Sequence, residues 1–85
     1  MFIPREEMYE RGNELIGAIN RDYQNALQEG FLDDSRVVKR IKEDLSSVQN
    51  VLQLLGDTSC SVFFAPMFES TLRTLEQKYL FRQSV

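Results

Sequence analysis

Apolar residues recur at every third or fourth position along two long stretches of this 85-residue chain, and a glycine follows each stretch. This spacing is typical of an α-helix that buries one face. The first stretch follows Pro4, which suits the first helical position because proline has no N–H group to leave unpaired. It stops at Gly30. The second stretch follows Asp33 or Asp34 as the N-cap and stops at Gly56.

These patterns predict helices over residues 4–29 and 34–55, which we expect to pack as an antiparallel hairpin because only GFLDD joins them. The segment DTSCSVFFAP has a polar start and an aromatic end, which predicts a turn and then an extended piece. A third helix is predicted over residues 66–82, opened by Pro66. No repeat or linker divides the chain, so the fold class we expect is a single all-α domain over residues 1–85.

Charge and composition exclude several classes of partner. A net charge of −3 argues against duplex nucleic acid as a partner, since nucleic-acid-binding domains normally carry a basic face. Cys60 is the only cysteine, so no intramolecular disulfide can form and a reducing compartment is favoured. No apolar run approaches the roughly 18 residues of a membrane span, and no signal-peptide pattern is present. We therefore expect a cytoplasmic protein without a membrane partner.

The residue types that carry most catalytic chemistry are missing. The chain has no histidine and one cysteine, so we expect no metal site, and Cys60 has no histidine base to activate it. No glycine-rich phosphate-binding loop is present, and we expect no cofactor. An enzyme can work with arginines and carboxylates alone, but the basic residues of the second helix mostly fall off its apolar stripe. We predict a protein that is not an enzyme.

Arginine and an aromatic residue meet near the start of the first predicted helix. Arg5 and Tyr9 are four residues apart and share a face, and Arg11 follows. A guanidinium can hold a phosphate and a ring can stack on a base, so these residues are candidates for binding a nucleotide. The alternative is that the two arginines pair with acidic residues of the same helix, namely Glu7, Glu10 and Glu14.

Hydroxyl groups form a second candidate cluster at Thr58 and Ser59, between the second helix and an apolar run. They can hydrogen-bond a ligand, or they can cap the next helix or turn the chain.

Two glycines and a surplus of aromatic residues point to self-association. Gly12 lies on the apolar stripe of the first helix and Gly17 lies off it, so both faces of this helix are expected to pack closely, and an oligomer offers a subunit interface for such packing. Apolar residues also gather at or beyond helix ends, where exposed patches mark partner surfaces. We expect a homo-oligomer whose interface includes Gly12, Gly17, Phe63, Phe64 and Phe81.

Two stretches resemble a known family. ERGNELIGAI is similar to the glycine-containing helix of the small phage anti-CBASS sponge proteins, which sequester cyclic oligonucleotide signals, and SRVVKRIKEDLSSVQNVLQLLGDTSCSVFF resembles their later helix. The resemblance covers about residues 8–64. Its matching elements are Arg36, Asp44-Leu45, Thr58 and Phe63 or Phe64.

The resemblance implies a compact helical hexamer that binds cyclic di- and trinucleotides at protomer interfaces without cleaving them. Tyr9, Arg11, Thr58 and Ser59 match the binding residues by type. Two features depart from the family: the third helix is additional, and arginine stands where the family has lysine. If the protein is encoded by a phage, it would act in the host cytoplasm.

We therefore predict a small non-enzymatic helical binding protein that sequesters cyclic nucleotide immune signals as an oligomer. The alternative is a helical protein–protein interaction module, such as a phage inhibitor of a host protein, a secretion co-chaperone or an assembly adaptor, because long amphipathic helices with surplus aromatics suit that role.

Overall fold

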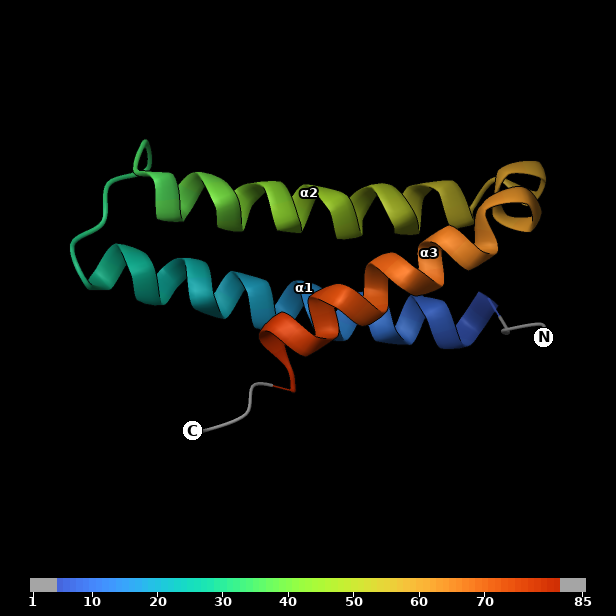
Figure 1. The fold of residues 1–85 in the computed structure, drawn as a ribbon, viewed down its shortest axis with the longest axis horizontal. Coiled ribbons are helices and arrows are strands. Elements are labelled where there is room, and N and C mark those ends of the chain that lie inside the picture. The colour runs from blue at the N-terminus through green and yellow to red at the C-terminus, as the bar shows by residue number, and fades with distance from the viewer. Residues whose placement is uncertain (1–4, 82–85) are drawn as a thin grey trace.

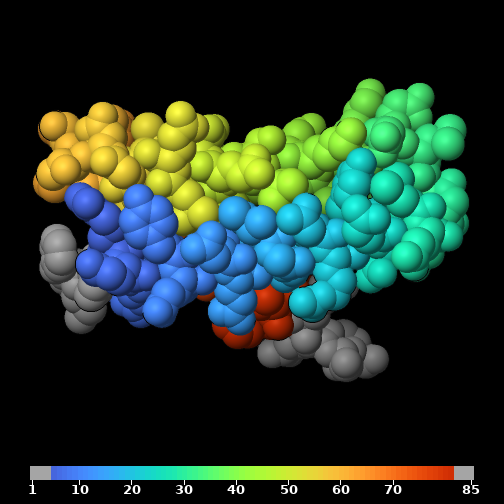
Figure 2. Space-filling view, turned by 180° about the vertical axis from the view of Figure 1, so that it is seen from behind, coloured from blue at the N-terminus to red at the C-terminus, as the bar shows by residue number. Residues whose placement is uncertain are grey.

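The computed structural model describes residues 5–81, which form three α-helices and, within that range, no strand. Helix α1 spans Arg5–Gln28, α2 spans Arg36–Leu55 and α3 spans Thr58–Tyr79. Figure 1 shows α2 returning alongside α1, after which α3 folds back and crosses in front of α1. Seen from behind, the middle of α3 is hidden by the α1–α2 pair while its start and end show at the edges, so α3 crosses one face of that pair (Figure 2). The predicted all-α class and the three helices are confirmed.

Helix α1 ends in a Schellman motif built around Gly30, whose φ of +98° lies in the left-handed region. The Gly30 N–H donates to the Leu27 carbonyl and the Phe31 N–H donates to the Ala26 carbonyl, both at 3.1 Å. The prediction that the helix ends at this glycine is confirmed. The predicted start at Pro4 lies outside the described residues.

Helix α2 is capped by Ser35, not by the predicted Asp33 or Asp34. Ser35 is extended (φ −67°, ψ 155°), and its hydroxyl accepts a hydrogen bond from the N–H of Val38 at 3.2 Å. Asp33 instead accepts a 2.8 Å hydrogen bond from the Tyr23 hydroxyl, and this bond raises the pKa of the tyrosine. Three consecutive residues here are good capping types, so composition alone could not choose among them.

Helix α3 begins at Thr58, well before the predicted start at Pro66, so the predicted turn and extended piece are wrong. The carboxylate of Asp57 caps the helix by accepting from the N–H of Cys60 at 3.1 Å. A proline inside a helix costs about 3 kcal/mol because it lacks an N–H and crowds the preceding turn. The cap, about 1 kcal/mol, and the full burial of Phe68, about 2–3 kcal/mol, together offset that cost.

Only Gly56 and Asp57 separate α2 from α3. Gly56 ends α2 as predicted: its N–H donates to the Gln53 carbonyl at 3.1 Å, and the N–H of Asp57 donates to the Leu54 carbonyl at 3.0 Å. This short connection makes α3 start directly beside the end of α2 and fold back over the α1–α2 pair (Figure 1). Helix α3 ends at Tyr79, slightly before the predicted end at residue 82.

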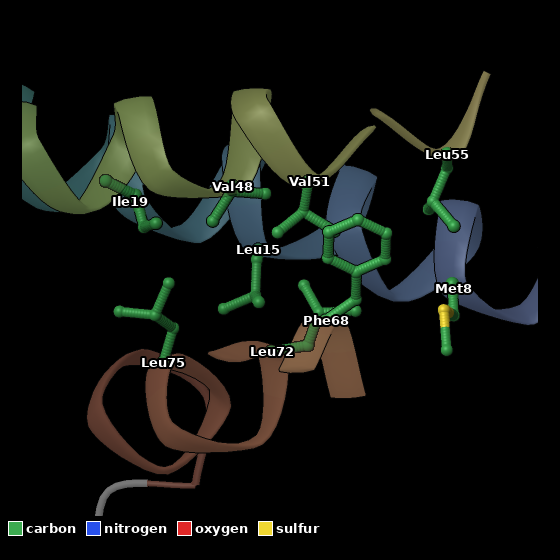
Figure 3. Close-up of a cluster of buried hydrophobic side chains, with 9 residues drawn as sticks. All are labelled: Met8, Leu15, Ile19, Val48, Val51, Leu55, Phe68, Leu72 and Leu75. Atoms are coloured by element: carbon green, nitrogen blue, oxygen red, sulfur yellow. The ribbon is translucent and has the colours of Figure 1, made fainter. Parts of the chain in front are cut away.

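The core lies where α3 crosses the other two helices. Figure 3 shows Phe68 and Leu72 of α3 among side chains that come from α1 and α2. Phe68 is 1% exposed, and Leu72 is fully buried. The apolar cluster draws on all three helices and consists of Met8, Leu15, Ile19, Val48, Val51, Leu55, Phe68, Leu72 and Leu75.

Gly12 lets α1 and α2 approach each other closely. A Cβ atom at this position would lie 2.6 Å from Cδ2 and 3.1 Å from Cγ of Leu52. The predicted close packing is therefore present, but it joins two helices of one chain. The assignment of Gly12 to a subunit interface is wrong, because the residue is buried under Leu52 of its own chain. Gly17 is exposed, and a Cβ atom added to it would meet nothing within 4 Å among the described residues, so a partner contact there stays a prediction.

Candidate functional site

Four of the five predicted ligand-binding residues lie at one end of the molecule. Arg5 is the first residue of α1, and Thr58 and Ser59 are the first residues of α3; Figure 1 places these two helix starts at the same end. The Tyr9 hydroxyl is 3.7 Å from the position that a Cβ atom would take on Gly56. Tyr9 is partly buried against the α2–α3 connection, while the other three side chains are exposed.

The hydroxyls of Thr58 and Ser59 do not cap α3, because Asp57 takes that position. Within the described range, neither hydroxyl forms a hydrogen bond; the backbone carbonyl of Thr58 accepts one from the Ser61 hydroxyl at 2.9 Å. Both side chains are exposed to solvent. They therefore remain open to a ligand.

Arg11 lies apart from this cluster because two carboxylates of α3 bind its guanidinium. Nε and Nη2 donate to the two oxygens of Glu76 at 2.9 and 2.7 Å, and Nη1 donates to Glu69 at 2.6 Å. All three side chains are largely buried: Arg11 is 21% exposed, Glu76 is 9% exposed and Glu69 is 18% exposed. Pairing of Arg11 with acidic residues of its own helix, the alternative stated above, is wrong. The partners belong to α3, and the sequence pattern does not predict that α3 packs against this face of α1.

The charges of this ion cluster stabilise one another. Hydrogen bonding to Glu76 raises the pKa of Arg11, although partial burial of the guanidinium opposes this. The hydrogen bond from Arg11 lowers the pKa of Glu69, which also accepts a 3.0 Å bond from Arg73. Arg11 therefore holds α3 against α1, and three of its five N–H donors are used for that.

A second polar contact ties α3 to α2. One oxygen of Asp44 accepts from the Lys78 ammonium at 2.7 Å and from the Tyr79 hydroxyl at 2.6 Å. Burial and this hydrogen bond raise the pKa of Tyr79, so the hydroxyl stays protonated and continues to donate. Asp44 thus positions the end of α3 on α2.

The first turns of α3 expose a continuous apolar surface. We call it the α3 surface and define it by Val62, Phe63, Phe64 and Met67, which are 71%, 84%, 41% and 52% exposed. Phe63 and Met67 are four residues apart, so they share one helix face. The Phe64 ring stands 6.2 Å from the rings of both Phe63 and the buried Phe68, which links the surface to the core.

The structure brings Phe63 and Phe64 together but leaves Phe81 elsewhere. Phe81 is 63% exposed and follows the opposite end of α3. The predicted interface is therefore not one surface. Val62 belongs to the apolar residues that the sequence places at helix ends, but sequence reasoning missed Met67, because it expects an extended segment before Pro66. A helix starting after Asp57 would have aligned Phe63 with Met67.

Within residues 5–81, no three histidine, cysteine, aspartate or glutamate side chains gather in a way that could hold a metal ion. None of the helices in the described part of the chain is long and apolar enough to span a bilayer. Comparisons with models of protein families, with curated proteins and with solved structures found no match.

Proposed function

We propose that this protein is a non-enzymatic helical interaction module that binds through the α3 surface, and that its partner is a second copy of the chain. The observation that carries the proposal is the exposure of Phe63, at 84%, beside three further large apolar side chains. Contiguous apolar patches of this kind are uncommon on monomers and mark sites of association.

The size of the α3 surface suits a small dimer. Taking about 150–250 Å² for a whole large side chain, its four members leave about 370–620 Å² exposed. Two facing copies would bury about 740–1,240 Å² from these side chains alone, a range that includes the roughly 1,000 Å² expected of a specific interface.

The charge pattern favours a second copy over a charged partner. No charged residue occurs from Thr58 to Phe68, whereas charged residues make up 27% of the whole chain. In a two-fold interface each patch meets itself, so any net charge on it would be repelled by its own copy. An uncharged surface avoids that repulsion.

The test compares two substitutions of exposed apolar residues. Phe63→Asp places a charge in the α3 surface, and Leu32→Asp, at a 70% exposed position in the α1–α2 loop, is the matched control. Sedimentation velocity over a concentration series should show a dimer or larger assembly for the wild type and for Leu32→Asp. It should show a monomer for Phe63→Asp, with an unchanged helical circular dichroism spectrum. A wild-type protein that stays monomeric at high micromolar concentration would contradict the proposal.

A cyclic-nucleotide sponge is the second candidate, supported by the location of Arg5, Tyr9, Thr58 and Ser59 at one end of the molecule. It loses one predicted contact, because Arg11 is bound by α3. A thermal-shift comparison of cyclic di- and trinucleotides with linear nucleotides tests it, since a ligand that binds the folded state raises the melting temperature. The shift should appear with cyclic ligands only and vanish in Tyr9→Ala; equal shifts in both proteins would rule out this site.

A further inference from the structure

A groove of about 400 Å³ lies where the end of α3 meets α1 and the first half of α2. Its apolar lining comes from Val37 and Ile41 of α2 and from Tyr79 of α3. In Figure 1, α3 ends before it reaches the α1–α2 loop. The last residues of α3 therefore border the groove, and α3 does not cross the part of the α1–α2 pair nearest the loop. The volume falls within the range of about 300–1,000 Å³ that is common for small-molecule sites.

The charged lining of the groove is mostly basic. Arg36, Arg40 and Lys78 line it together with a single carboxylate, Asp22, in a chain whose net charge is −3. A neighbouring hollow is lined by the same two arginines and Lys39, with Asp34 and Glu43 at its other positions. Several of the ten basic residues of the chain therefore gather beside one apolar groove, far from the α3 surface.

Arg36 and Arg40 of α2 occupy positions where a positive charge destabilises the helix. Arg36 and Arg40 are four residues apart, so their like charges face each other on one side of the helix. Both lie in the first turns of α2, at the positive end of its dipole, and the first turn carries no acidic residue. Within residues 5–81, neither arginine nor Lys39 forms an ion pair, in contrast to Arg11, which is bound by two carboxylates.

A bound anion would relieve this repulsion, and the groove determines what kind of anion fits. Arginine binds phosphate and carboxylate groups with two parallel N–H donors. The aliphatic and tyrosine walls offer contact to an apolar or aromatic body of the same ligand. Lys78 is held by Asp44 at 2.7 Å and lies 5.5 Å from the centre of the Tyr79 ring, so its charge is largely balanced and the charge available to an anion comes from the two arginines.

We infer that this groove binds a small organic anion, with its phosphate or carboxylate on Arg36 and Arg40 and its apolar body against Val37, Ile41 and Tyr79. The site is independent of the α3 surface and of the predicted nucleotide residues, which lie at the other end of the molecule (Figure 1).

Heteronuclear NMR titration of the full chain tests the inference with four probes: 1-naphthyl phosphate, 1-naphthoate, 1-naphthol and inorganic phosphate. The two naphthyl anions should give saturable shifts at the amides of Val37, Ile41 and Tyr79. Neutral naphthol and inorganic phosphate should each bind at least tenfold more weakly, because each lacks one half of the recognised chemistry. The stronger of the two naphthyl anions identifies the preferred acidic group.

Matched double variants assign the effect to the arginines. Arg36→Gln combined with Arg40→Gln should weaken naphthyl phosphate binding at least tenfold. Arg21→Gln combined with Arg73→Gln removes the same charge from exposed positions outside the groove lining and should change binding less than twofold. Equal affinities in the two double variants, shifts centred on the α3 surface, or inorganic phosphate binding as tightly as naphthyl phosphate would each overturn the inference.

Discussion

Replacing Arg11 with methionine should destabilise the protein far more than an ordinary surface substitution. The change keeps much of the side-chain volume but removes the three hydrogen bonds to Glu69 and Glu76. The two carboxylates would then remain close together, with 18% and 9% of their side chains exposed. Removing one partner of a fully buried ion pair costs about 3–5 kcal/mol.

The expected loss for Arg11→Met is smaller, about 2 kcal/mol, because the guanidinium keeps some contact with water and the carboxylates can partly rehydrate. For a domain of this size, that corresponds to a fall in melting temperature of about 8–16 °C. Urea denaturation followed by circular dichroism measures the free energy of unfolding directly. Arg73→Met is the matched control: Arg73 also binds Glu69, but its side chain is 67% exposed, so the expected loss is below about 0.5 kcal/mol.

The same cluster gives a pH dependence whose sign follows from Glu69. Its pKa in the folded state lies below the ordinary value of 4.5, chiefly because Arg11 donates to it. The folded state therefore holds the carboxylate charged more strongly than the unfolded state does, and this stabilisation is present above pH 4.5 and lost as the pH falls through the folded pKa. Arg11→Met should flatten the acid limb of the stability profile. A variant as stable as Arg73→Met, with an unchanged acid limb, would refute the structural role of Arg11.

Further predictions concern the backbone of α1 and α3. Pro66→Ala should stabilise the protein by about 1–2 kcal/mol in urea denaturation, because alanine restores the N–H that the Val62 carbonyl lacks inside α3; no gain would mean that the helix starts near residue 66. Gly17→Ala should stabilise the chain by up to about 1 kcal/mol, because the added methyl group meets open space. Gly12→Ala should gain less than Gly17→Ala, because Leu52 must move to admit the methyl group; equal gains would contradict the close packing.

The sequence was sufficient to predict α1 and α2 because the signals that define these helices lie within each segment. The apolar period of each helix reports which face is buried, and Gly30 and Gly56 mark the ends whatever the rest of the chain does. The start of α3 was not predictable by the same rules. Pro66 is a strong local signal for a first turn, and it is overridden by the Asp57 cap and by the burial of Phe68, which depends on α1 and α2 being in place.

The candidate site shows the same division between local and distant information. The exposed aromatic residues of the α3 surface could be listed from the sequence, but their joint face appears only when the segment is helical. Arg11 illustrates the limit more sharply. Its partners stand 58 and 65 residues away along the chain, so no spacing rule within α1 could find them. A residue that local reasoning assigns to a ligand is bound instead by the helix that covers it. Arg36 and Arg40, exposed at the start of α2, pair with no carboxylate among the described residues and line the groove beside the end of α3.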